Sequence, residues 1–173
     1  MRRFAILGLA LALFACDDDN PTGPSNSGPI VFTAELRASN EVPPIANAES
    51  NAQGTATITF SVPRDASGNV TGDGTWTVQA VVGGFTDTSV IRLAHIHNGA
   101  AGQNAGVFVD TRINVTGQPI PVSSGSTTIN IEQVQILQSQ AQAVLNNPAG
   151  HYFNMHTALN GGGALRGQLV RVQ

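Results

Sequence analysis

The chain has 173 residues, 41% of them hydrophobic and 11% charged, and its formal net charge at pH 7 is −3. This length and apolar content suit one domain with a hydrophobic core of its own. The basic residues are all arginines and, beyond the N-terminus, lie far apart, which excludes a basic surface for nucleic acid. Cys16 is the only cysteine, which excludes an internal disulfide framework.

Residues 1–15 are predicted to be a secretory signal peptide. Arg2 and Arg3 precede an apolar run that is too short to span a bilayer comfortably. The run ends in LFAC, which resembles the bacterial lipoprotein box, where cleavage before the cysteine leaves a lipid-modified N-terminus. Phe14 is bulkier than the residue usual there. We therefore expect Cys16 to be lipidated and to anchor the chain to a membrane, the alternative being a spare thiol beside a cleavage site.

Residues 16–29 are expected to form a flexible acidic tether after this anchor. Asp, Asn, Pro, Gly and Ser dominate the stretch DDDNPTGPSNSGP, which has no apolar surface to bury. Without the signal peptide the chain keeps six arginines against eleven acids, a net charge of −5. The expected location is the cell envelope, with the chain lipid-anchored on the periplasmic or the cell-surface side of a membrane.

Residues 30–173 are predicted to form one all-β domain. Apolar and polar residues alternate in TATITFSV (residues 55–62) and TWTVQAV (residues 75–81), as in antiparallel strands with one face in the core. Segments rich in glycine, proline and serine separate the expected strands. The further strands are expected at Val31–Arg37, Ile91–His97, Val107–Ile113, Thr127–Ile131, His151–Thr157 and Leu165–Val172.

One segment departs from the two-residue alternation. Apolar residues recur there every three or four positions, which predicts an amphipathic helix over residues 132–146. Asn130 is expected to cap its start, and NNPAG to end it. About eight strands and this helix predict a Greek-key antiparallel β-sandwich whose helix covers one end or face. The apolar positions of the helical pattern are Val134, Leu137, Ala141 and Val144.

Histidine is the informative residue type for chemistry. The chain has no G-x-S-x-G elbow, no phosphate-binding glycine loop, no C-x-x-C pair and no paired carboxylates suited to glycoside hydrolysis. His95 and His97 fall on one expected strand and point to the same face, about 7 Å apart at Cα. In YFNMHT (residues 152–157), Met155 is expected to enter the core while His156 lies on the opposite face.

If the two histidine-bearing strands are neighbours, His156 meets His95 and His97. Three neutral imidazoles with an open position suit Cu(II) or Zn(II), and copper has the higher intrinsic affinity. The alternative is structural, since histidines on a strand face also hydrogen-bond the backbone of a following loop. His151, at the start of its strand, is predicted to lie at the surface.

Four motifs, in this order, resemble the CHRD domain, a module that is named from chordin and also occurs in bacterial exported proteins. The likeness covers about residues 31–170. It implies an extracellular β-sandwich module, and no enzymatic activity carries over from it. The motifs are ASNEVPP (38–44), AHIHNGAAGQNAGVFV (94–109), YFNMHT (152–157) and GGALRGQL (162–169).

One position departs from this resemblance. The last motif of the family usually carries a glutamate two residues before its arginine, where this chain has Ala164. Arg166 therefore needs another partner, and we expect a structural ion pair with Glu41 of the first motif. Such a pair would pin the N-terminal segment across the last strand.

A looser likeness is to Cu,Zn superoxide dismutase, a Greek-key sandwich in which an H-x-H strand binds copper. The chain lacks that enzyme's further ligands and its disulfide cysteine, because it has only four histidines and one cysteine. A complete two-metal site is therefore not expected, and shared architecture would not transfer the chemistry.

Three functions remain open. The favoured one is a non-catalytic, membrane-tethered binding module whose loop residues Asn98, Gln103 and Asn104 contact a protein or small ligand. The second, compatible with the first, is a lipoprotein that holds copper or zinc through the three histidines for storage or delivery. The third and least favoured is a redox or hydrolytic metalloenzyme, because no base or nucleophile accompanies the histidines.

Overall fold

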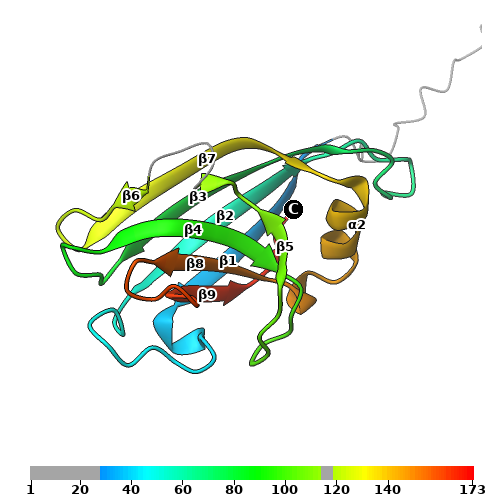
Figure 1. The fold of residues 1–173 in the computed structure, drawn as a ribbon. Coiled ribbons are helices and arrows are strands. Elements are labelled where there is room, and N and C mark those ends of the chain that lie inside the picture. Colours follow the sequence, from blue (N-terminus) through cyan, green and yellow to red (C-terminus); the bar gives the residue numbers. More distant parts are fainter. Residues whose placement is uncertain (1–27, 114–118) are drawn as a thin grey trace, which may run out of the picture.

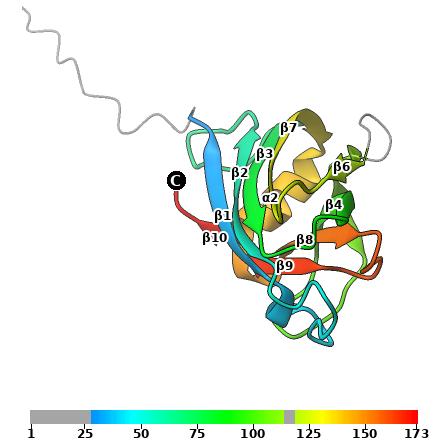
Figure 2. The same cartoon turned by 90° about the vertical axis from the view of Figure 1, so that its left-hand side faces the viewer.

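The computed structural model describes residues 28–113 and 119–173. The predicted signal peptide, Cys16 and nearly all of the predicted tether lie outside the described residues. The described part is an all-β structure in which one ten-stranded sheet curls around a core (Figures 1 and 2), so the predicted fold class is confirmed. No helix among these residues is long and apolar enough to cross a membrane.

The strands pair in the order β5-β4-β8-β9-β1-β2-β3-β7, with β6 beside β4 and β10 beside β1. Strand β9 lies next to β1 of the β1-β2-β3 meander, so strands from the two ends of the domain are neighbours in the sheet. The strands are β1 (Ile30–Arg37), β2 (Gln53–Ser61), β3 (Gly74–Gly83), β4 (Val90–His97), β5 (Val107–Asp110), β6 (Ile120–Pro121), β7 (Ser126–Ile136), β8 (Tyr152–Thr157), β9 (Leu165–Gln168) and β10 (Val170–Arg171). The helical elements are η1 (Ala38–Asn40), α2 (Gln138–Asn146) and η2 (Pro148–Gly150).

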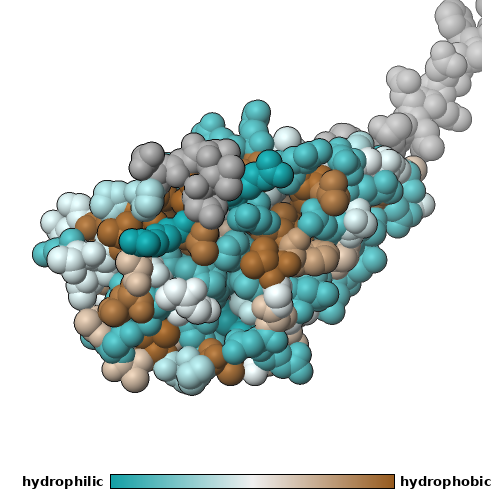
Figure 3. Space-filling model, in the orientation of Figure 1, coloured by the Kyte–Doolittle hydropathy of each residue, from teal (hydrophilic) through white to brown (hydrophobic). Residues whose placement is uncertain are grey.

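The core lies inside the curled sheet and follows the two-residue alternation of the strands. Phe32, Phe60 and Trp76 come from neighbouring strands and are fully buried. The Phe60 ring meets the other two edge-on, with centroids 5.1 and 6.3 Å away, a geometry that aromatic pairs favour. On the face shown in Figure 3, hydrophobic residues appear as separate patches among hydrophilic ones.

The helix predicted over residues 132–146 is wrong in its first part. Those residues continue strand β7 as far as Ile136, and α2 begins only at Gln138. Asn130 lies inside β7 and caps no helix. The second part is correct: α2 lies at one end of the curled sheet (Figure 1) and buries Ala141 and Val144 completely.

A β-bulge accounts for the helix-like spacing. Trp76 of β3 pairs with Val134, and Val78 pairs with Ile131, so β7 holds one extra residue at this point. Gln133, whose φ is 52°, lies in the bulge. Because the extra residue moves the inward positions by one, the two-residue alternation gains a three-residue step that imitates a helix.

Candidate metal centre

Strands β4 and β8 separate apolar from polar side chains by alternation over residues 94–97 and 152–156. Ala94 and Ile96 of β4 and Met155 of β8 have no exposed surface and belong to the core, as predicted for Met155. His95 and His97 of β4 and the alternate residues of β8 point away from that core. This second face is also buried, because loops cover it, and its side chains are polar: Tyr152, Asn154 and His156 are 2–6% exposed.

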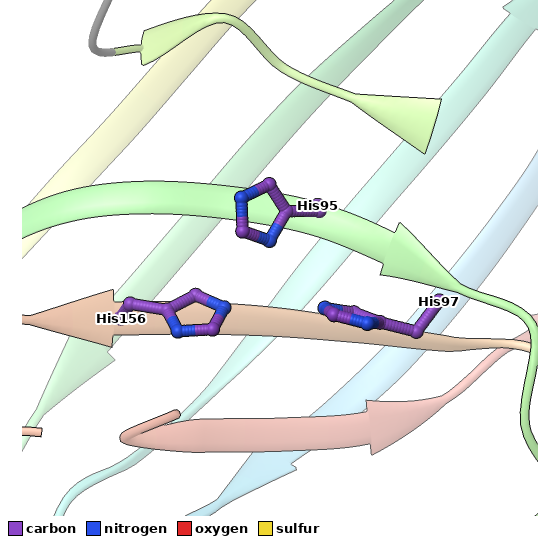
Figure 4. A group of neighbouring side chains, drawn as sticks. All are labelled: His95, His97 and His156. Atoms are coloured by element: carbon purple, nitrogen blue, oxygen red, sulfur yellow. The ribbon is translucent and has the colours of Figure 1, made fainter. Parts of the chain in front are cut away.

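The antiparallel pairing of β4 and β8 brings the three predicted histidines together. His95 is paired with Asn154, so His156, two residues further along β8, is its diagonal neighbour. The ring centroid of His95 lies 4.7 Å from that of His156 and 5.3 Å from that of His97. The centroids of His97 and His156 lie 6.1 Å apart. Figure 4 shows the rings of His97 and His156 extending toward each other, with His95 beside the space between them.

Each of the three rings has one buried nitrogen without a hydrogen-bond partner. His97 Nδ1 lies 2.9 Å from the carbonyl oxygen of Ala105, and His156 Nδ1 lies 3.0 Å from that of Gly161. A carbonyl only accepts, so each Nδ1 carries the hydrogen and each Nε2 keeps its lone pair. Both Nε2 atoms, and Nδ1 of His95, are buried with no hydrogen-bond partner.

The environment keeps the three imidazoles neutral. Burial and, to a smaller extent, the neighbouring His156 and His97 lower the pKa of His95 to about 4, against a smaller opposing effect of Asp110. Burial also lowers the pKa of His97 and of His156, although hydrogen bonds from their rings to backbone carbonyls oppose the shift. Neutral imidazole is the form that binds a metal ion.

The arrangement is suited to one metal ion held by nitrogen. One ring nitrogen from each of His95, His97 and His156 lies within 4.8 Å of the other two. A tetrahedral ion bound at about 2.0–2.1 Å needs nitrogens about 3.3 Å apart, so the rings must close inward by small rotations. The backbone carbonyls that fix the Nδ1–H groups serve as the outer partners that orient metal-binding histidines.

A stack of three side chains adjoins the histidines. Tyr152 lies parallel to His97, with an interplanar angle of 2° and centroids 4.7 Å apart. The Arg166 guanidinium, from the strand on the other side of Tyr152, lies 3.5 Å from the centroid of the same ring. The stack fixes the plane of the His97 ring from the side opposite β5.

The expected ion pair between Glu41 and Arg166 is not formed among the described residues. Asn154 Nδ2 donates to Glu41 Oε1 at 2.7 Å, and Arg166 Nη2 donates to the Ala100 carbonyl at 2.7 Å. Burial raises the pKa of Glu41 to about 7, against smaller opposing effects of the hydrogen bond from Asn154 and of the charge of Arg166. A Cβ at Gly163 would lie 2.7 Å from Glu41 Oε2, so glycine is needed where the carboxyl group packs.

The other predicted residues have mixed outcomes. His151 is 3% exposed, so the prediction of a surface position is wrong; its Nδ1 lies 2.9 Å from the Asn147 carbonyl, which holds it inward. Asn98, Gln103 and Asn104 are exposed. Asn104 is nevertheless engaged within the chain, because its Nδ2 donates to the Val42 carbonyl at 2.7 Å.

The family model of the CHRD domain matches residues 32–169, which include every strand from β2 to β9 and all three histidines. The chain belongs to the CHRD domain family. Comparisons with curated proteins and with solved structures give no match. The polar face of this CHRD domain is built from the motifs that carried the resemblance, since HIH, YFNMH and LRG supply β4, β8 and β9.

Sequence reasoning assigned no role to several residues of the CHRD domain that the structure places at or near this face. Tyr152 stacks on a histidine, and Asn154 holds the Glu41 carboxyl group. Both share the alternation of His156, so that pattern was a signal for them. Glu49 is completely buried at the end of β8, and nothing in its neighbouring sequence indicated this.

Proposed function

We propose that this CHRD domain is a binding module that holds one copper or zinc ion through His95, His97 and His156. The observation that supports it most is the set of three converging, buried ring nitrogens that lack partners. Leaving buried polar atoms without hydrogen bonds costs free energy, and a bound ion would satisfy all three together. The chemistry is that of a nitrogen-ligand site for Cu(II) or Zn(II).

The structural alternative explains only part of the site. Hydrogen bonds from His97 and His156 to loop carbonyls do hold the backbone that covers the face. Those bonds use Nδ1, however, and a purely structural role gives no reason for the remaining nitrogens to face one another. His151 makes the same kind of backbone bond, yet it does not belong to the cluster.

The site is tested by titrating the chain, purified without a polyhistidine tag and stripped with chelator, with Cu(II) and with Zn(II). We expect one ion per chain, and we expect His97→Ala and His156→Ala each to abolish stoichiometric binding. His151→Ala is the matched control, since it removes a buried histidine outside the cluster and should leave binding intact. Equal, weak binding by the wild type and by His97→Ala would refute the proposal.

We further propose that the module acts outside the cytoplasm on a lipid anchor at Cys16, storing or delivering its ion. The support is the sequence alone: an apolar leader that ends in LFAC, followed by an acidic tether. Expressed in a bacterial host, the wild type should fractionate with membranes, and Cys16→Ser should be released in soluble form. Membrane association that persists in Cys16→Ser would contradict the anchor without affecting the metal site.

A further inference from the structure

A pocket of about 470 Å³ lies beside the polar face, away from the three histidines. Its walls are the segment of residues 39–44, the loop around Ala101 and Gly102, and two residues of β9 and its end, Arg166 and Gln168. The volume is in the range of sites for small molecules. Val42, Pro44 and Ala101 give part of the wall an apolar character.

Arg166 is the unusual member of this wall. Its side chain is among the largest that are completely buried, with 1% exposure, and it forms no salt bridge within the described residues. Nη2 donates to the Ala100 carbonyl, and the guanidinium plane lies on Tyr152. Nη1 is buried without any hydrogen-bond partner. The Glu41 carboxyl group interacts with this charge at longer range, but the two form no salt bridge. A buried charge without a salt bridge is costly, so an anion beside Nη1 would be favoured.

The two side-chain amides of the wall, those of Asn40 and Gln168, are already engaged. The side-chain amide of Asn40 donates to the carbonyl of Arg166, and that of Gln168 donates to the carbonyls of Gly99, Ala149 and His151. The guanidinium itself is held by the Ala100 carbonyl, by Gln168 Oε1 at 3.4 Å and by the Tyr152 ring, while Nη1 has no partner. A guanidinium fixed in this way is preorganised to bind a carboxylate.

We propose that this pocket binds a small organic carboxylate, whose charge pairs with Arg166 and whose apolar part packs against Val42 and Pro44. Glu41 lies in the same wall, and because burial raises its pKa to about 7, it can carry a proton that it donates to the ligand. The pocket is separate from the proposed metal site and needs no metal ion.

The test uses the chain isotopically labelled for NMR, stripped of metal and titrated with benzoate and with benzamide, its neutral counterpart of similar shape. Benzoate should cause saturable shifts at residues 39–44, 99–102 and the Arg166 side chain. Benzamide should bind at least about tenfold more weakly, because it cannot pair with the guanidinium. The proposal fails if benzoate gives no saturable shifts or if benzamide binds equally well.

A pair of variants at an exposed position of the pocket tests whether the negative charge of the ligand determines its binding. Ala101→Asp supplies a carboxylate within the chain and should weaken benzoate binding about tenfold, whereas Ala101→Asn, of the same size, should bind like the wild type. Equal affinities in the two variants would overturn the proposal. The same variants should bind zinc normally, and His156→Ala should still bind benzoate, so failure of one site is distinguishable from failure of the other.

Discussion

Two buried polar clusters contain consecutive residues at one end of β8, and they differ in how many of their atoms have hydrogen-bond partners. Thr157 belongs to a cluster around Glu49, whose carboxyl oxygens accept hydrogen bonds from Ser89, Thr157 and Asn160, each at 2.6 Å. His156, one residue earlier, belongs to the histidine cluster, in which three ring nitrogens have no partner. Both clusters are shielded from water, since Glu49 is fully buried and the histidines are 6–7% exposed.

The contrast separates a structural cluster from the proposed binding site. At Glu49, donors from a loop, from β8 and from the turn after β8 converge on one acidic group, so the cluster joins three segments and needs nothing more. At the histidines, ring nitrogens converge on each other without hydrogen-bond partners, which is why we propose that they bind an ion. The same burial therefore contributes stability in one cluster and, if the proposed function is correct, binding capacity in the other.

The largest stability effect is expected at the fully partnered cluster. Glu49→Gln keeps the shape of the side chain but replaces one carboxyl oxygen with an amide NH₂, which cannot accept a hydrogen bond. The variant therefore loses either the bond from Ser89 or the bonds from Thr157 and Asn160. We expect the free energy of unfolding to fall by about 3 kcal/mol, as for a buried hydrogen-bond network with a charged acceptor. Chemical denaturation measures this change.

The exposed Glu35 offers a matched control for that substitution. Its side chain is 80% exposed and pairs with Arg37 at 3.6 Å, so Glu35→Gln should change the free energy of unfolding by less than about 0.5 kcal/mol. If Glu49→Gln were equally mild, the hydrogen bonds around Glu49 would not be what holds those segments together.

The next effect concerns the unpartnered cluster. An ion that binds only the folded state should raise the free energy of unfolding by about 2.7 kcal/mol at a concentration one hundred times the Kd. Zinc, which is not redox-active, is the suitable ion for this denaturation experiment. The increase should vanish in His97→Ala and persist in Glu49→Gln, because that variant keeps all three imidazoles.

A different outcome would reverse the contrast between the clusters. If zinc stabilised the wild type and His97→Ala to the same extent, the ion would be bound elsewhere, and the facing nitrogens of the histidines would have only a structural role.

Much of the histidine site could be predicted from sequence because the period of a β-strand is two. The alternation in HIH and YFNMH assigns His95, His97 and His156 to the face opposite Ala94 and Met155 without knowledge of the fold. That β8 pairs with β4 did not follow from the sequence, since the two strands are far apart along the chain and their pairing depends on the topology of the whole sheet.

The errors arose where a local pattern had two physical causes. A bulge in β7 and a helix both place apolar residues three positions apart, and only the pairing of Val134 with Trp76 distinguishes them. For Glu41, opposite charge predicted an ion pair with Arg166, but the carboxyl group instead accepts a hydrogen bond from Asn154, in the middle of β8. Partners of buried polar groups are selected by tertiary geometry, which charge alone does not specify.

The histidine cluster should also give the metal-free protein a characteristic response to acid. His95 has a pKa of about 4 in the folded state against an ordinary value of 6.5, so the unfolded chain binds a proton more readily between these values. The free energy of unfolding should therefore fall as the pH drops from about 6.5 to about 4. The measurement is a series of denaturation curves in the presence of chelator.

Replacing the His95 ring shows whether it causes this slope of the free energy of unfolding against pH. His95→Asn should flatten it in part, leaving the contributions of His97 and His156, whose pKa values are also lowered by burial. An unchanged slope in His95→Asn would mean that other groups dominate the acid response.

An effect of similar size and opposite sign is expected at Glu41, which is intermediate between the two clusters because its side-chain hydrogen bond comes from Asn154. Burial raises its pKa from 4.5 to about 7, so the folded state holds this proton more tightly than the unfolded chain does. Its contribution to stability is present at low pH and is lost as the pH rises from about 4.5 through about 7, opposite in sign to that of His95. Glu41→Gln, which is neutral at every pH, should therefore be more stable relative to the wild type at about pH 8 than at about pH 5. A difference between the two proteins that does not change with pH would show that Glu41 is as well accommodated when ionised as when protonated.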